Sequence, residues 1–300
     1  MDWLFEILKS ILFGIVEGIT EWLPISSTGH LILLDSFLSI DVAPELGEVF
    51  QKEYREMFQV VIQLGAILAV LVLFFGKLNP FSPQKTPSER KSTWRMWLMI
   101  LIASVPALIF GLGLDLILEK ATGKDMDGWL YNAPVVAAML ILYGVAFLFV
   151  EKLMKKREAR IESVEEINWK TALSIGAFQA LAVIPGTSRS GSTILGSMIL
   201  GLSRPCAAEF SFFMAIPAML GASLLKALGF GKYVLENAVS VPIKAWVVLF
   251  AAMITAFAVS MIAIKFLMEF VKKRSFAPFG WYRIALGAVV LLYFVGTLVF

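Results

Sequence analysis

The chain has 300 residues, of which 59% are hydrophobic and only 16% are charged, and its mean hydropathy is +0.81. Because a soluble domain carries about 25% charged residues to cover its surface, this composition excludes a soluble fold and indicates a protein embedded in lipid. A net charge of only +3 argues against nucleic-acid binding, and the single cysteine, Cys206, excludes an intramolecular disulfide and a multi-cysteine metal site.

Residues 1–40 are the first predicted element. They contain two short apolar runs on either side of a polar break, Pro24-Ile25-Ser26-Ser27-Thr28-Gly29-His30. A membrane-spanning helix needs roughly 20 mostly apolar residues, which neither run reaches. Irregular backbone at membrane depth is tolerated only where protein or a water-filled cavity surrounds it, so we predict a re-entrant helical hairpin here. Its internal glutamates and its lack of a small-residue cleavage site are typical of mature protein rather than of a signal peptide.

Six longer apolar stretches are predicted to cross the membrane. They begin near Met57, Trp94, Pro134, Cys206, Lys244 and Trp281 and end near Gly76, Gly113, Lys152, Leu228, Phe270 and Phe300, respectively. Between the third and the fourth stretch, residues 168–203 again contain two short runs and a polar break, Pro185-Gly186-Thr187-Ser188-Arg189-Ser190-Gly191. This segment predicts a second re-entrant hairpin.

Basic residues gather in three loops, at positions 77–95, 152–160 and 272–274. The loop after the second span is instead acidic, with Asp115, Glu119, Asp125 and Asp127. Because cytoplasmic loops carry the excess of lysine and arginine, the three basic loops are predicted to face the cytoplasm. The first hairpin then enters the membrane from outside and the second from inside. Each half is a hairpin followed by three spans, so the halves have opposite topology.

The predicted fold class is therefore an all-α integral membrane protein with six transmembrane helices and two re-entrant hairpins in an inverted-topology repeat. It forms a single domain, residues 1–300, with halves at roughly 1–153 and 165–300. The hairpins are also alike in sequence, since Gly14-x-x-Glu17 parallels Gly176-x-x-Gln179 and the two breaks match with a one-residue slip. In such repeats the polar tips meet near the middle of the membrane, where substrates bind.

Glu17 and Glu21 are four residues apart and therefore share one face of a helix. Each carboxylate costs roughly 2.5–3.5 kcal/mol at membrane depth, and the two repel each other. They are tolerated either in a water-filled mouth near the surface or around a bound cation, and we favour the cation. Carboxylate oxygens suit Mg²⁺ or Ca²⁺, which also accept oxygens from substrate phosphates.

His30 is the only histidine and follows three hydroxyl-bearing residues in the first break. A lone histidine in a protein core is usually structural. This one is adjacent to serines and to the glutamate-bearing helix, and an imidazole exchanges protons near neutral pH. We therefore predict that it transfers a proton or attacks the substrate itself.

Arg189 lies in the second break, between Gly186 and Gly191. Glycines let successive backbone N–H groups face one concavity, and the start of the following helix adds positive potential, so both features favour an anion. A guanidinium donates a forked pair of hydrogen bonds that matches phosphate oxygens. The alternative is an arginine that reaches the membrane surface, which its predicted depth argues against. The predicted phosphate ligands are Ser26, Thr28, Thr187, Ser188, Arg189 and Ser190.

The two breaks resemble the motifs of the undecaprenyl-diphosphate phosphatases, also called bacitracin-resistance proteins. Residues 17–30 resemble the glutamate-rich motif of that family and residues 185–193 its second motif, and length and order of hydropathy agree along essentially the whole chain. Motif position carries the family's roles to Glu17, Glu21, Ser27, His30, Ser188 and Arg189.

The resemblance implies a multi-pass enzyme of the bacterial inner (plasma) membrane whose site opens to the outer, periplasmic side. It implies that the enzyme removes the terminal phosphate of undecaprenyl diphosphate and so recycles the carrier lipid for peptidoglycan and other wall polymers. It also implies dependence on a divalent metal and lowered sensitivity to bacitracin. The expected partners are the polyprenyl diphosphate lipid and the bilayer, with no nucleic acid; the oligomeric state, a homodimer included, is open.

The catalytic set predicted on these grounds is Glu21, Ser27, His30 and Arg189, with Glu17 and Glu21 as metal ligands. Three nucleophiles are open: Ser27 activated by His30, a metal-activated water, and His30 itself. Arg189 would neutralise charge on the transferring phosphoryl group, because electrostatic stabilisation dominates phosphoryl transfer.

Two other functions fit parts of the pattern. Inverted repeats with broken helices are typical of transporters, so a flippase for a polyprenyl phosphate lipid is the first alternative. Two carboxylates would repel such a phosphate unless a metal were bound between them. The second alternative is a lipid phosphatase related to the type-2 phosphatidic acid phosphatases, but that chemistry uses two histidines and this chain has one.

Overall fold

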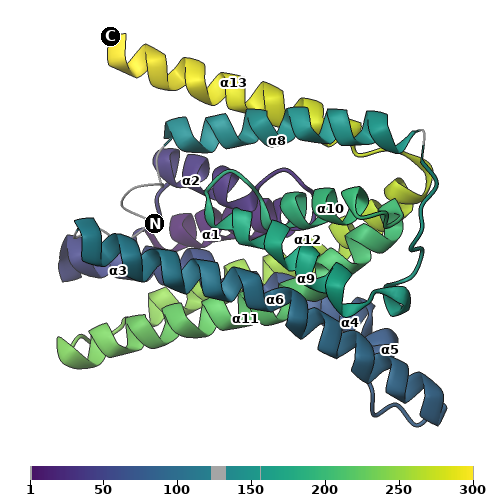
Figure 1. Ribbon diagram of the computed structural model, residues 1–300. Helices are drawn as coiled ribbons and strands as arrows, with labels where there is room; N and C mark the ends of the chain where they lie inside the picture. The colour runs from purple at the N-terminus through teal and green to yellow at the C-terminus, as the bar shows by residue number, and fades with distance from the viewer. Residues whose placement is uncertain (1, 123–132, 156, 300) are drawn as a thin grey trace. The chain divides into compact units, whose positions relative to one another are not determined.

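The computed structural model describes residues 2–122, 133–155 and 157–299. Within these ranges the chain is nearly all helical and forms no strand, as the predicted all-α class requires. Figure 1 labels the helices. The α-helices are α1 (Asp2–Thr20), α2 (Ser27–Phe37), α3 (Gly47–Val61), α4 (Gln63–Leu73), α5 (Phe75–Leu78), α6 (Pro87–Thr122), α8 (Ala133–Met154), α9 (Trp169–Ala180), α10 (Arg189–Ile199), α11 (Arg204–Glu236), α12 (Ile243–Lys273) and α13 (Ala277–Val299), and the 3-10 turns are η1 (Pro44–Leu46), η2 (Val164–Glu166) and η3 (Leu181–Val183).

The prediction of six spans is confirmed in the described part of the chain. The helical stretches long and apolar enough to cross a membrane are Pro44–Leu73, Pro87–Gly111, Pro134–Met154, Arg204–Glu236, Ile243–Lys273 and Ala277–Phe294. The first starts well before the predicted Met57, because amphipathic α3 continues into apolar α4. An apolar run marks only the part of a helix that matches lipid, whereas backbone hydrogen bonds extend the helix through polar residues. Of the acidic loop predicted after the second span, Asp115 and Glu119 lie in the helix α6, while Asp125 and Asp127 lie outside the described residues.

The described chain forms two compact units that interleave along the sequence. The first consists of Met1–Trp22, His30–Phe75 and Ala215–Lys265, and the second of Leu23–Gly29, Gly76–Met214 and Phe266–Phe300. Helices α11 and α12 each contribute residues to both units. The repeat halves, the re-entrant course of segments 1–40 and 168–203, and their depth in the membrane stay predictions.

In the first unit, α1 packs directly on α12. A Cβ atom added to Gly14 would lie 2.5 Å from the carbonyl oxygen of Ala252, and one added to Gly18 would lie 2.8 Å from that of Ala256. Only glycine permits two backbones to approach this closely. The contact fixes the helix that carries Glu17, whose side chain is fully buried between the two glycine turns.

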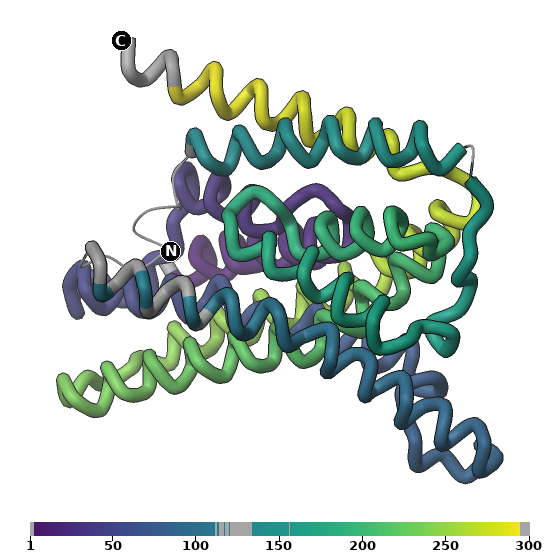
Figure 2. The backbone as a smooth tube through the Cα atoms, in the orientation of Figure 1, coloured from purple at the N-terminus to yellow at the C-terminus, as the bar shows by residue number. Residues whose placement is uncertain are grey.

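In the second unit, α8 and α13 lie side by side (Figures 1 and 2). Glu151, near the end of α8, forms a salt bridge with Arg204 of α11, with a hydrogen bond of 2.9 Å from Nε of Arg204. The same carboxylate accepts a hydrogen bond from the backbone N–H of Phe276 at 2.7 Å. Glu151 is almost fully buried, so these bonds replace the water that its carboxylate loses. The Glu151 side chain therefore connects the end of α8 to the start of α11 and to the residue that precedes α13.

Helix α9 packs against α6 through Gly176, and this contact makes a prediction about stability. A Cβ atom at Gly176 would lie 2.2 Å from the carbonyl oxygen of Ala103, a backbone atom that cannot turn away. Overpacking of this kind costs about 1–3 kcal/mol, so we expect Gly176→Ala to lower the melting temperature in detergent by several degrees.

Gly229→Ala is the matched control, because nothing lies within 4 Å of the Cβ position at Gly229 in α11. Removing a glycine from an exposed helix interior stabilises it by up to about 1 kcal/mol, so this variant should melt at or slightly above the wild-type temperature. Equal melting temperatures for the two variants would contradict the proposed packing.

Candidate active site

The first polar tip follows the end of α1. Glu17 and Glu21 lie one helical turn apart, since the N–H of Glu21 donates to the carbonyl of Glu17 at 3.0 Å just past the last residue of α1. Both side chains are buried in the first unit, with exposed fractions of 0% and 6%. The predicted pair therefore shares one face in a region of low dielectric, where two carboxylates need a positive partner.

Beyond Trp22 the first tip belongs to the second unit. Ser26 has a positive φ of 77°, and its Oγ accepts a hydrogen bond from the N–H of Gly29 at 3.3 Å. This bond caps α2, whose first residue is Ser27. His30 follows in the same first turn, and residues three apart in a helix share a face, so Ser27 and His30 project to the same side of α2.

The second tip has the same local geometry. Ser188 has a positive φ of 69°, and its Oγ accepts from the N–H of Gly191 at 3.1 Å, which caps α10. Positive φ is uncommon for serine and costs free energy, so its occurrence at both caps indicates a backbone shaped for function. Ser26 is thus the counterpart of Ser188, and the one-residue slip between the breaks lies between the proline and the capping serine.

Glycine is required in the second tip at Gly186. Its φ is +87°, and a Cβ atom there would lie 2.5 Å from the carbonyl oxygen of Val136 in α8. The tip is therefore seated directly on the α8 backbone. Any larger residue would lift the loop that carries Thr187, Ser188 and Arg189.

The two tips are joined within the second unit. Ser190 in the second tip donates its hydroxyl to the carbonyl of Leu23 in the first, at 3.4 Å. Ser188 and Ser190 also share a hydrogen bond at 3.2 Å between their hydroxyls. The structure therefore places all the predicted phosphate ligands in one unit: Ser26, Thr28, Thr187, Ser188, Arg189 and Ser190. The predicted nucleophile Ser27 belongs to the same unit. Glu17, Glu21 and His30 belong to the first unit.

Arg189 is the first residue of α10 and is partly buried. Its Nη1 donates to the carbonyl of Ser211 in α11 at 2.7 Å. Thr193, one turn further along α10, bonds to the Ser211 hydroxyl at 2.7 Å. This anchoring holds the guanidinium at the N-terminal end of α10, where backbone N–H groups also present positive potential to an anion.

The two buried carboxylates fit a divalent cation that completes its ligand set elsewhere. Among the residues that the structure describes, no three histidine, cysteine, aspartate or glutamate side chains come together in a metal-binding arrangement. Mg²⁺ commonly uses one or two carboxylates together with substrate phosphates and water, and Glu17 and Glu21 match that requirement.

Sequence reasoning missed Arg283, which lies in the last apolar span. Its side chain is 0% exposed, and its guanidinium donates to main-chain carbonyls of both tips. The available signal was a single arginine within an otherwise apolar span, a position where a charge is rare and usually functional. Gln179 and Thr187 are also buried, and across the described chain no hydrogen-bond partner is found for their side-chain polar atoms. Such atoms mark a place where water or a polar ligand is accommodated.

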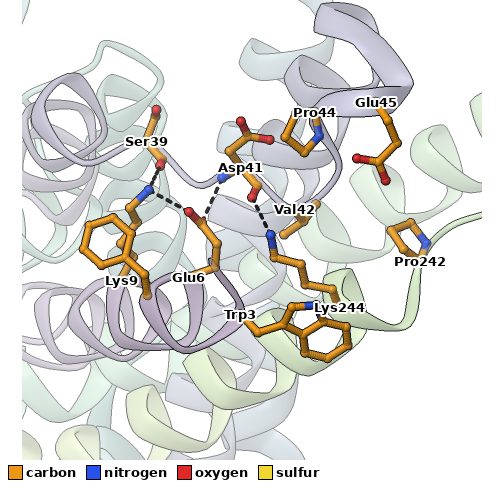
Figure 3. A pocket seen from close by; sticks show the side chains of 11 residues that line it. Trp3, Glu6, Lys9, Ser39, Asp41, Val42, Pro44, Glu45, Pro242 and Lys244 are labelled. Atoms are coloured by element: carbon orange, nitrogen blue, oxygen red, sulfur yellow. Dashed lines mark hydrogen bonds and ion pairs between the residues drawn. The ribbon is translucent and has the colours of Figure 1, made fainter. Parts of the chain in front are cut away.

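A pocket of the first unit contains none of the predicted site residues. It encloses about 720 Å³ between the start of α1, the segment before η1 and the start of α12 (Figure 3). Lys9 bonds to Glu6 at 2.7 Å, the main-chain N–H of Asp41 bonds to Glu6 at 2.9 Å, and Lys244 bonds to the main-chain carbonyl of Asp41 at 3.2 Å. These bonds connect α1, the segment before η1 and the start of α12.

Comparison with known proteins agrees with the geometry. A family model described as "Bacitracin resistance protein BacA" matches residues 10–289. An undecaprenyl-diphosphatase of Enterococcus faecalis is 48% identical over 285 residues, which cover 95% of this chain and 96% of that protein. Undecaprenyl-diphosphatases of Streptococcus gordonii and Acetivibrio thermocellus are 48% and 47% identical, over 97% and 98% of this chain and 96% and 100% of their own lengths.

Proposed function

This chain belongs to the BacA family of bacitracin resistance proteins, and we propose how it hydrolyses undecaprenyl diphosphate to undecaprenyl phosphate and inorganic phosphate. It is a multi-pass membrane protein. Its product is the carrier lipid that peptidoglycan synthesis reuses, and its activity lowers the amount of diphosphate that bacitracin can sequester. We place it in the plasma membrane with its site open to the outer side, as the arrangement of basic loops supports.

The observation that carries the proposal is that the starts of α2 and α10 are each capped by a serine and are connected by a hydrogen bond within the second unit. Ser26 caps α2 and Ser188 caps α10, and both serines have a positive φ. A hydrogen bond from Ser190 to Leu23 links the two tips. Two helix N-termini and a forked guanidinium suit a headgroup with two phosphates. In our proposal Arg189 and the hydroxyls of the second tip bind the phosphoryl group that is transferred.

Glu17 and Glu21 are the proposed ligands of the divalent cation, Mg²⁺ or Ca²⁺. When bound, the cation neutralises charge on the diphosphate oxygens. The carboxylates themselves orient the cation and, in its absence, repel the substrate. The burial of both carboxylates supports this role, because a buried pair of like charges needs a positive partner.

Ser27 is the proposed nucleophile. Its Oγ attacks the terminal phosphorus while His30 takes the hydroxyl proton, the anhydride bond breaks, and undecaprenyl phosphate leaves. Water then hydrolyses the phosphoserine and releases inorganic phosphate, with His30 returning the proton to Ser27. The position of the two residues in the first turn of α2 supports this pairing. An activated water and a phosphohistidine on His30 are the alternatives.

Lipid transport is the second candidate function, because transporters also bind anionic substrates at the N-termini of broken helices. The buried carboxylate pair favours hydrolysis, since transport of a phosphate headgroup needs no metal. Flipping of a labelled lipid in vesicles separates the two functions when the phosphatase is inactive.

The test is phosphate release from undecaprenyl diphosphate by the purified protein in detergent. We expect release with Mg²⁺ or Ca²⁺ and a loss of at least about 100-fold with EDTA, because a metal supplies several kcal/mol of charge stabilisation. In acid-quenched samples, labelled phosphoserine at position 27 supports Ser27, an acid-labile adduct supports His30, and no adduct supports water. Folded protein without release under any metal would contradict the phosphatase mechanism and leave transport as the function.

A further inference from the structure

Arg283 of α13 is a fully buried arginine whose donors are directed at irregular backbone. Its Nη1 donates to the carbonyl of Pro24 at 3.1 Å. Its Nη2 donates to the carbonyls of Gly186 and Thr187 at 2.7 and 2.9 Å. One guanidinium thus bonds to the first tip on one side and to the second tip on the other, all within the second unit.

Burying this guanidinium costs free energy unless its N–H groups make hydrogen bonds that the fold requires. Burying a cation costs several kcal/mol, and the hydrogen bonds of this buried guanidinium go to main-chain carbonyls. The ring of Tyr143 also lies against it, 5.4 Å from the guanidinium carbon. Backbone carbonyls outside helices need partners at membrane depth, and the tips are the irregular part of the backbone. Arg283 therefore satisfies both tips at once.

The geometry of the guanidinium matters as well as its charge. Its donors are fixed in one plane, so the carbonyls of Pro24, Gly186 and Thr187, together with that of Met139 at 3.5 Å, are held at fixed positions relative to one another. Lysine has one nitrogen on a flexible stem and cannot bridge them in this way. Arg283 also packs against the first turn of α10, where a Cβ atom on Gly191 would lie 3.0 Å from Nη1. Arg283 therefore contributes to the spacing between the tips, together with the hydrogen bond from Ser190 to the Leu23 carbonyl.

We infer that Arg283 is a positioning residue for phosphoryl transfer: by bonding to Pro24, Gly186 and Thr187, it helps to set the distance between the two tips that bind the diphosphate. It does not touch the substrate. Pro24 precedes Ser26 and Ser27 by two and three residues, and Thr187 directly precedes Ser188 and Arg189. A change in spacing therefore moves the nucleophile relative to the phosphate ligands. The inference rests on the function proposed above.

The principal variant is Arg283→Lys, which keeps the charge, with Arg283→Met as a second. A misplacement of reacting groups by about 1 Å costs about 100-fold in rate, so we expect kcat per folded molecule to fall by that factor in Arg283→Lys, with KM within about threefold of wild type. Hydrogen exchange of backbone amides in residues 23–29 and 185–191 should become faster in both variants. This exchange readout does not depend on catalysis, so it tests the bridge even if the wild-type protein releases no phosphate.

Arg204→Lys is the matched control, because Arg204 also makes hydrogen bonds that join helices of the second unit but bonds to Glu151 rather than to the tips. It should lower the melting temperature and leave kcat per folded molecule and tip exchange unchanged. Wild-type kcat and tip exchange in Arg283→Lys would overturn the inference. So would equal kcat losses in the two lysine variants, or an Arg283→Lys protein that cannot be purified folded while Arg204→Lys can, because these outcomes assign Arg283 to folding alone.

Discussion

Glu21→Gln is expected to abolish metal-dependent release of phosphate from undecaprenyl diphosphate, with kcat lowered about 10³-fold. Glutamine keeps the size and one carbonyl oxygen of the side chain but removes the charge that a hard cation requires. The residue is buried one turn from Glu17, so no water shell replaces the lost ligand. The measurement is phosphate release in detergent across a titration of Mg²⁺ or Ca²⁺. If the loss arises from weakened metal binding, higher metal concentrations should recover part of the rate.

Glu6→Gln provides a closely matched control. Glu6 lies in the same helix as Glu17 and is 5% exposed, but it is held by Lys9 and by the N–H of Asp41 (Figure 3). Removing its charge breaks a buried ion pair and should reduce stability. Its kcat per folded molecule should remain that of wild type. Equal loss of kcat in both glutamine variants would show that a charge anywhere on α1 matters and would contradict a metal role for Glu21.

Replacement of Arg189 should produce the second-largest loss. We expect Arg189→Ala to lower kcat/KM by about 10³-fold and Arg189→Lys by about 10²-fold, because lysine supplies charge without a forked pair of donors. The hydrogen bond from Nη1 to Ser211 holds the wild-type guanidinium at the start of α10 and leaves its other nitrogens to donate to a phosphate, whereas lysine has all its donors on one nitrogen. Initial rates over a range of lipid concentrations measure both parameters.

Arg160→Ala is the control for charge alone. Arg160 is exposed and lies against Gly201, just beyond the end of α10 that is opposite Arg189. The substitution changes the net charge of the protein by the same amount but leaves the tips intact. Its kcat/KM should stay within about twofold of wild type, since exposed charges are screened by salt. If Arg189→Ala loses no more activity than Arg160→Ala, then Arg189 has no direct role with the phosphate.

The membrane-spanning helices were predictable because hydropathy is a local property. Each span contains a long apolar stretch, as Pro134–Met154 does, and lipid leaves such a stretch only one way to satisfy its backbone. The two serine-rich breaks were predictable for the same reason, since short runs such as those around Ser26 and Ser188 cannot cross the membrane separately. Helix starts depend on hydrogen bonding as well as on hydropathy. The first span consequently begins at Pro44 rather than near Met57.

The tertiary structure alone decided how the tips are held. The counterpart of Ser26 is Ser188, and this match depends on backbone dihedrals and on bonds to Gly29 and Gly191 that no spacing rule specifies. Arg283 lies nearly 100 residues from the second tip and more than 250 from the first, and it belongs to neither motif. Its role follows only from the hydrogen bonds that it makes to both tips in the folded protein. The residue types for phosphate chemistry can be recognised in sequence because their chemistry is intrinsic to each side chain. Their spacing depends on contacts between segments far apart in the chain, which only the folded protein brings together.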